Sequence, residues 1–200
     1  KVMNLTAITD PTEIVTRHFL DCAALAPYMP QDGRVLDVGT GAGFPGIPLK
    51  IVYPELEVVL LDSLNKRVKF LNAVIKNLGL TGITAIHGRA EDIAKQEEYR
   101  EGFDLVVSRA VANLSSLSEY CLPFVKTGGM FVPYKSGNVD TELSEASRAI
   151  KVLGGEYRDT VRFELPGTDI DRTLVVIEKV KETPKKYPRK AGTPSKEPIK

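Results

Sequence analysis

The sequence predicts a Rossmann-like α/β fold: a seven-stranded, mostly parallel sheet with an antiparallel C-terminal hairpin and helices on both faces. Two observations predict it. Short apolar runs alternate with helical patterns along most of the 200 residues, which is typical of a parallel sheet covered on both sides. The last two apolar runs have no helical pattern between them, so they pair most simply as an antiparallel hairpin.

Seven apolar or alternating runs account for the strands of this sheet. Helical patterns separate most of the first five runs, which makes them the parallel part. The link before the seventh run contains Pro166 and Gly167, two residues that favour a turn. The expected strands are residues 34–38, 57–61, 83–87, 103–108, 129–134, 156–164 and 173–180.

Helical patterns are expected before and between these strands. The first begins at Asp10 and Pro11, a capping residue followed by one that suits the first turn of a helix. Ser63 is expected to cap a helix that Gly79 ends. The expected helices are residues 10–28, 45–53 (with Ile47, Ile51 and Val52 on one face), 63–78, 114–124 and 141–153.

The chain is expected to form one domain over residues 1–180, which a helical segment at residues 1–30 opens. Residues 181–200 are rich in Pro, Gly and Lys and lack an apolar pattern, so we expect an extended tail outside the core. Residues 179–200 contain eight Lys or Arg and two Glu, a net charge of +6, which leaves the first 178 residues with −5 of the overall +1. Such a tail suggests a polyanionic partner, although a merely solvated tail would have the same composition.

Composition excludes several classes of protein. No apolar run approaches the ~20 residues that span a bilayer, and residues 1–10 lack the apolar stretch of a signal peptide. Cys22 and Cys121 make neither a disulfide framework nor a zinc site, and two lone thiols fit a reducing compartment. We therefore expect a cytoplasmic monomer without a metal site or a membrane partner.

A glycine-rich segment from Asp37 to Gly46 joins the first expected strand to the next helix. In open α/β sheets, ligands bind outside the carboxyl ends of the strands, and glycines let a ligand approach the backbone closely. Two patterns overlap here. Gly41-x-Gly43-x-x-Gly46 matches the nicotinamide-dinucleotide fingerprint, whereas Asp37-x-Gly39-x-Gly41-x-Gly43 matches the motif of S-adenosylmethionine (SAM) methyltransferases.

Three features favour SAM over a dinucleotide. Asp37 precedes the first glycine, where a carboxylate suits an ammonium group better than a pyrophosphate. An acidic turn, Gly88-Arg-Ala-Glu-Asp92, follows the third strand and suits an adenine edge. The terminal hairpin also departs from a plain dinucleotide-binding domain. Asp62 does not separate the two cofactors, because it can accept hydrogen bonds from the ribose that both contain.

Several segments of the chain are more specific than the glycine motif. They are residues 3–8, 18–21, 37–46, 61–63 and 88–91, together with Ser108-Arg-Ala-Val-Ala112 and Tyr187-Pro-Arg-Lys-Ala-Gly-Thr-Pro194. In these segments, which extend over nearly the whole chain, the sequence resembles the bacterial 16S rRNA (guanine-N7) methyltransferase family, also called glucose-inhibited division protein B.

The resemblance implies a SAM-dependent methyltransferase fold and methylation of a guanine near the decoding site, on 16S rRNA or the 30S ribosomal subunit. Members of the family usually carry more helix before the Asn-Leu-Thr segment, so we expect this sequence to be a trimmed form. The resemblance also implies that the SAM pocket is lined by Gly39, Phe44, Ala90, Glu91 and Arg109.

The residues present agree with guanine N7 as the methyl acceptor. Enzymes that methylate an exocyclic amine generally carry an Asn/Asp-Pro-Pro-aromatic motif after the fourth strand, where this chain has Ser108-Arg109-Ala110. Methylation of a pyrimidine carbon needs a nucleophilic Cys, and Cys121 lies in a helical pattern. N7 attacks through a free lone pair and loses no proton. No general base is required, and alignment can contribute ~7–11 kcal/mol.

Cationic side chains are the candidates for contacts with the RNA. Arg109 is expected to position the base through guanine O6 or a phosphate. Further RNA contacts are expected from Lys135, Lys185, Lys186, Arg189 and Lys190. Two other functions stay open at this point: an NAD-dependent oxidoreductase built on the same loop, and a non-catalytic RNA-binding module with a vestigial SAM pocket.

Overall fold

A computed structural model describes residues 19–109, 111–135 and 139–200. Within this part of the chain, one sheet has the strand order β3-β2-β1-β4-β5-β7-β6. The first five strands pair in parallel, and β7 is antiparallel to both β5 and β6, so the predicted fold class is confirmed. The strands are β1 (Arg34–Val38), β2 (Glu57–Asp62), β3 (Ile83–His87), β4 (Phe103–Arg109), β5 (Val125–Lys135), β6 (Gly155–Glu164) and β7 (Asp171–Lys179).

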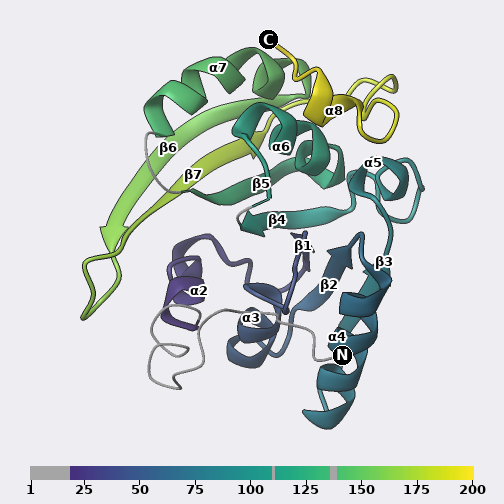
Figure 1. Ribbon diagram of the computed structural model, residues 1–200, viewed down its shortest axis with the longest axis vertical. Coiled ribbons are helices and arrows are strands. Elements are labelled where there is room, and N and C mark those ends of the chain that lie inside the picture. The colour runs from purple at the N-terminus through teal and green to yellow at the C-terminus, as the bar shows by residue number, and fades with distance from the viewer. Residues whose placement is uncertain (1–18, 110, 136–138) are drawn as a thin grey trace.

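Helices cover both faces of the sheet, as Figure 1 shows. One face carries α2 (Asp21–Ala23), η2 (Ala26–Tyr28), α3 (Gly46–Val52) and α4 (Asn65–Asn77). The other face carries α5 (Ala90–Ile93), α6 (Leu114–Cys121), η3 (Leu122–Phe124) and α7 (Val139–Val152), and α8 (Thr193–Lys196) packs on α6.

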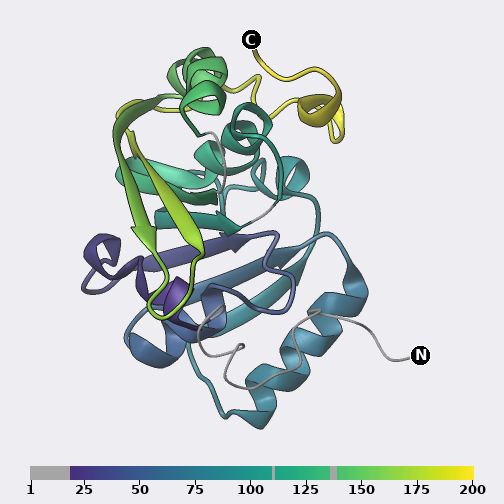
Figure 2. The ribbon, with the colours of Figure 1, turned by 60° about the vertical axis from the view of Figure 1, so that its left-hand side comes forward.

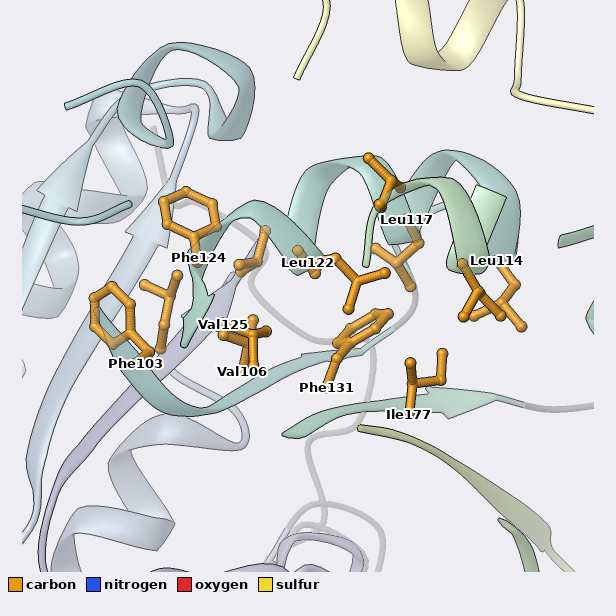
Figure 3. Close-up of a cluster of buried hydrophobic side chains, with 14 of the residues drawn as sticks. Phe103, Val106, Leu114, Leu117, Leu122, Phe124, Val125, Phe131 and Ile177 are labelled. Atoms are coloured by element: carbon orange, nitrogen blue, oxygen red, sulfur yellow. The ribbon is translucent and has the colours of Figure 1, made fainter. Parts of the chain in front are cut away.

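The strands feed two separate hydrophobic clusters because successive side chains of a strand point to opposite faces. Along β1, Val35 enters the cluster with α3 and α4, and Leu36 enters the cluster with α6 and α7. Figure 3 shows the second cluster, in which Phe103, Phe124 and Phe131 are fully buried. Burial of each such ring stabilises the fold by roughly 1.5–3 kcal/mol.

Two predictions about helices are wrong in detail. Of the expected apolar face of α3, Ile47 is buried, but Ile51 and Val52 are 50% and 66% exposed. Ser63 does not cap α4. The residue before that helix is Leu64, whose backbone N–H donates to Asp62 Oδ1 at 2.8 Å.

The expected start of the first helix, at Asp10 and Pro11, lies outside the described residues. The described part of that expected helix, residues 19–28, contains α2 and η2. Figure 2 shows the long β6–β7 hairpin extending down one side of the molecule. At the start of β7, Arg172 Nε lies 3.3 Å from Asp21 Oδ2 of α2. This contact joins the hairpin to α2, which precedes β1.

The prediction of an extended tail is wrong. Residues 181–200 pack beside α6, and Thr183, Pro188 and Pro194 are buried. At the root of the tail, the Lys179 side chain is fully buried and donates to the backbone oxygens of Leu122 and Val125. The tail therefore belongs to the folded body: Tyr187 and Ile199 pack on the hydrophobic cluster of α6 and α7, and polar contacts such as those of Lys179 hold its root.

Candidate functional site

A cavity of about 260 Å³ lies at the carboxyl edge of the parallel strands. Its volume is near the lower end of the ~300–1,000 Å³ typical of small-molecule sites, and its position is the one where open α/β sheets bind ligands. The cavity is lined by residues at or just after the carboxyl ends of four strands, and by one residue each from α6 and the tail. The lining residues are Val38, Gly39, Leu61, Ser63, Gly88, Arg89, Ala90, Glu91, Val111, Ala112, Tyr120 and Ser195.

The glycine loop after β1 forms one wall of this cavity. The backbone of Gly39 has φ +73°, which a residue with a Cβ rarely adopts. A Cβ at Gly39 would lie 2.6 Å from Val111 Cγ2, whereas a Cβ at Gly41, with φ +60°, would have no neighbour nearer than 3.9 Å. Because Gly39 has no side chain, it leaves a space beside the backbone, here called the cradle, that a side chain would fill. This space suits a ligand that lies directly against the backbone.

Asp62 holds the glycine loop from behind. Its side chain is 2% exposed, and Oδ2 accepts a hydrogen bond from Gly41 N at 3.0 Å. Arg67 Nη1 lies 3.3 Å from the same oxygen. Asp62 is expected from the sequence to bind a ribose, but it is not among the residues that line the cavity, and in this structure it fixes the shape of the loop.

Asp37 is the second carboxylate behind the loop and is fully buried. Its Oδ2 accepts hydrogen bonds from Thr40 Oγ1 at 2.7 Å and from Gly46 N at 3.0 Å. Its Oδ1 is buried and has no hydrogen-bond partner among the described residues. Burial raises the pKa of Asp37 to about 6, against the opposite effect of the two hydrogen bonds. The carboxylate is therefore ionised at neutral pH, and it places a negative charge under the loop.

The raised pKa of Asp37 predicts a stability that falls as the pH rises from 4 to 6. In this window the folded protein retains a proton that the unfolded chain has released, because the carboxyl pKa is 3.8 unfolded and about 6 folded. One pH unit is worth about 1.4 kcal/mol per proton, so ionised Asp37 costs about 3 kcal/mol above pH 6. Asp37→Asn retains an accepting oxygen and should remove this loss. Urea unfolding at pH 4, 5, 6 and 7 checks it, and equal slopes in both proteins would contradict it.

Arg109 and Phe44 form a second cluster beside the same loop. The Arg109 guanidinium lies 5.5 Å from the centroid of the Phe44 ring, and Arg109 Nη1 lies 3.1 Å from Asp21 Oδ2. Phe19 packs edge-on against Phe44, with ring centroids 5.5 Å apart. Asp21 is 1% exposed, and its Oδ1 has no hydrogen-bond partner among the described residues. The structure thus brings Arg109 and Phe44 together, but beside the cavity and not within its lining.

Of the other residues assigned to the cofactor, some line the cavity and others lie outside its lining. Gly39, Ala90 and Glu91 line the cavity, whereas Asp37, Gly41, Gly43 and Asp62 are absent from its lining. Several lining residues were not predicted from the sequence: three lie within the quoted segments but were given no role, and two lie outside them. These residues are Ser63 after β2, Val111 and Ala112 after β4, Tyr120 on α6 and Ser195 on α8.

Two of the five cations assigned to RNA are held within the protein. Lys135 Nζ lies 2.6 Å from Glu142 Oε1 and donates to the Ala112 oxygen at 3.0 Å. Arg189 Nη2 lies 2.7 Å from Glu119 Oε2, a carboxylate that is fully buried. The remaining three cations, Lys185, Lys186 and Lys190, are exposed.

No group of His, Cys, Asp or Glu that could hold a metal ion is found within residues 19–109, 111–135 and 139–200. In the same residues, the helices are too short or too polar for any of them to cross a bilayer.

Comparison with protein families gives one match over most of the chain. A family model described as "GidB: rRNA small subunit methyltransferase G" matches residues 1–174. A protein of Lachnoclostridium phytofermentans named "Ribosomal RNA small subunit methyltransferase G" is 58% identical, over 98% of this chain and 82% of its own length. A protein of Clostridium tetani with the same name is 52% identical, over 100% of this chain and 84% of its own length.

Solved structures with a similar fold are more distant in sequence. A predicted O-methyltransferase of Agrobacterium tumefaciens superposes with a TM-score of 0.63 at 18% identity, over 83% of this chain and 82% of its own. A geranyl diphosphate C-methyltransferase of Streptomyces coelicolor gives a TM-score of 0.61 at 12% identity, over 80% of this chain and 78% of its own. At these identities the likeness shows the fold alone.

Proposed function

Because the chain belongs to the rRNA small subunit methyltransferase G family, we propose that it methylates N7 of a guanine in 16S rRNA. As a member of that family it is a SAM-dependent rRNA methyltransferase. The observation that carries the proposal is the cradle at Gly39, which opens into a cavity at the carboxyl ends of β1 to β4. The choice of N7 is supported by the residues after β4, which offer neither an amide–proline motif nor a thiol.

The residues of the cavity fit the cofactor of this family. SAM, when bound, supplies a methyl group on a cationic sulfur that a nucleophile can attack. Gly39 would lie against it, and Leu61, Ser63 and Ala90 would surround its nucleoside. The ionised Asp37 lies under the loop, where its charge favours a cationic ligand over an anionic one.

The protein's part in the reaction is to hold the base in position. Guanine N7 needs no proton acceptor, so the chemistry requires alignment and exclusion of water. Arg109 suits this task, because Asp21 and the Phe44 ring fix its guanidinium beside the loop. A fixed guanidinium can donate to guanine O6 and leave N7 open to the methyl group.

Contact with RNA is proposed to run through the exposed cations Lys185, Lys186 and Lys190. Arg189 and Lys135 are less suited, since carboxylates within the protein already engage them. We place the enzyme in the cytoplasm as a monomer acting on the rRNA of the small ribosomal subunit.

Transfer of a labelled methyl group tests the proposal. Purified protein and SAM with a labelled methyl are incubated with 30S subunits or with naked 16S rRNA from cells lacking the modification. We expect label in one guanine, and borohydride reduction followed by aniline should cleave the RNA there, as it does at 7-methylguanosine. Label at a site that resists this cleavage would refute N7 as the methylated atom but would still show methyltransferase activity. Heat on titration with NADH, and none with SAM, would favour an oxidoreductase instead.

A further inference from the structure

We propose that the C-terminal segment, residues 187–200, is a wall of the SAM site, and that Arg189 positions this wall and is not a contact for RNA. This inference rests on the proposed function, because it concerns the same cavity. It rests directly on two observations. Ser195 lines the cavity together with residues that follow β1 to β4, and Glu91, one of the lining residues, is bonded to this segment.

Arg189 and Glu119 form the main attachment of the segment. Glu119 lies on α6 and is fully buried, although a carboxylate is rarely found inside a protein without a partner. Its Oε1 accepts from Arg189 N at 2.8 Å and from Nε at 3.0 Å, and its Oε2 accepts from Nη2 at 2.7 Å. Backbone and side chain of one residue thus satisfy both oxygens, which fixes where the segment leaves α6.

Further contacts hold the segment along α6 and at its root. Ser116 Oγ donates to the oxygen of Pro194 at 2.7 Å, and Ser115 Oγ donates to the oxygen of Ile199 at 2.6 Å. Arg100 Nη1 donates to the oxygen of Tyr187 at 3.0 Å. These donors bind backbone oxygens, so the path of the segment is fixed independently of its exposed side chains.

The segment meets the cavity between Gly192 and Ser195. Gly192 N donates to Glu91 Oε1 at 2.8 Å, and Glu91 itself is 4% exposed. Burial raises the pKa of Tyr120, and its hydrogen bond with Ser195 acts in the opposite direction. Glu91, Tyr120 and Ser195 therefore meet at one side of the cavity, next to the turn after β3.

This side is where the adenine would lie. In folds of this type the ribose lies at the end of the second strand, so a nucleoside running from Gly39 past Ser63 reaches the turn after β3. There, Glu91 is already occupied by Gly192 N. The carboxylate thus holds the tail in place, and the tail in turn closes the adenine end of the site.

The first test compares two cations that are neighbours in the tail. Arg189→Ala removes the attachment, whereas Lys190→Ala removes an equal charge from an exposed side chain. Calorimetry with S-adenosylhomocysteine, the methyl-free product, should show about tenfold weaker binding for Arg189→Ala and a change within about twofold for Lys190→Ala. Unchanged affinity in Arg189→Ala, combined with weaker binding to 30S subunits, would overturn the proposal in favour of an RNA contact.

The second test uses the unaltered protein, so it does not depend on whether a variant folds. Hydrogen exchange is followed with and without S-adenosylhomocysteine. We expect the ligand to slow exchange in the peptide over residues 190–196 as well as in residues 88–91. Protection of residues 88–91 alone would refute the wall but leave the SAM site intact. Absence of any heat or protection with the unaltered protein would refute the proposed function itself, and the wall with it.

Discussion

Replacement of Gly39 by alanine is expected to weaken SAM binding about 100-fold, close to 3 kcal/mol. Two costs oppose the loop conformation that binds SAM, so the free variant relaxes away from this conformation and binding must restore it. A left-handed backbone conformation with a Cβ costs roughly 1–2 kcal/mol, and at Gly39 φ is +73°. The new Cβ would also lie 2.6 Å from Val111 Cγ2, at the wall of the cavity. Isothermal titration of SAM measures the loss.

Gly41 provides the matched control for this substitution. Its φ of +60° imposes a similar backbone cost, but a Cβ there would meet nothing nearer than 3.9 Å. Gly41→Ala should therefore weaken binding only about five- to tenfold. Equal losses at Gly39 and Gly41 would show that backbone strain alone explains the effect and that the close approach to Val111 does not matter.

A second substitution can restore part of the affinity. Val111→Ala removes both γ-methyl groups, and with them the nearest atoms to the new Cβ at Gly39. We expect the double variant to bind SAM about tenfold more tightly than Gly39→Ala alone. A double variant that is as weak as the single one would contradict the steric explanation.

Replacement of Lys179 by methionine is expected to lower the free energy of unfolding by about 3–5 kcal/mol. The Lys179 ammonium is fully buried and lies 2.9 Å from Glu101 Oε1. It also donates to the backbone oxygens of Leu122 and Val125 and to Thr183 Oγ1. Methionine fills a similar volume but removes the cation that faces the Glu101 carboxylate and takes one donor from each of two backbone oxygens. Equilibrium unfolding in urea measures the change.

Lys181→Met serves as the control, because Lys181 lies only two residues after Lys179 and its side chain is exposed. Its effect should stay within about 0.5 kcal/mol. Adding Glu101→Gln to Lys179→Met should recover part of the loss, since the amide oxygen can still accept from Thr183 N without leaving a charge unpaired. A loss below about 1 kcal/mol in Lys179→Met would show that water replaces the ammonium.

The sheet could be predicted from sequence because its signals are local. The strands β1 and β2 are buried along nearly their whole length, so they appear directly as apolar runs, and the turn residues Pro166 and Gly167 mark the hairpin. The cavity could be located for the same reason, since the glycine loop and the turn after β3 both follow strands. What a sequence pattern cannot give is which of these groups already has a partner within the protein.

The tail illustrates this limit. Its lysines and prolines are typical of a solvated segment, and Arg189 has the same appearance as Lys190. Their environments differ because Arg189 meets Glu119, whose position on α6 brings a carboxylate into the interior. The polar residues Ser115, Ser116 and Glu119 in a buried helix were the available signal, and they indicated that something polar covers that helix.

The amide groups of the glycine loop give the site a chemical selectivity. Gly39 N and Thr40 N donate to the oxygen of Leu61, Gly41 N donates to Asp62 and Gly46 N donates to Asp37. A diphosphate bound at such a turn depends on outward-pointing N–H groups at the start of the following helix, and here these donors are satisfied from inside. The turn therefore suits one of two adenosine-containing molecules better than the other: these amides are not available to the phosphates of a dinucleotide, whereas the buried carboxylates of Asp37 and Asp62 behind the loop favour a sulfonium.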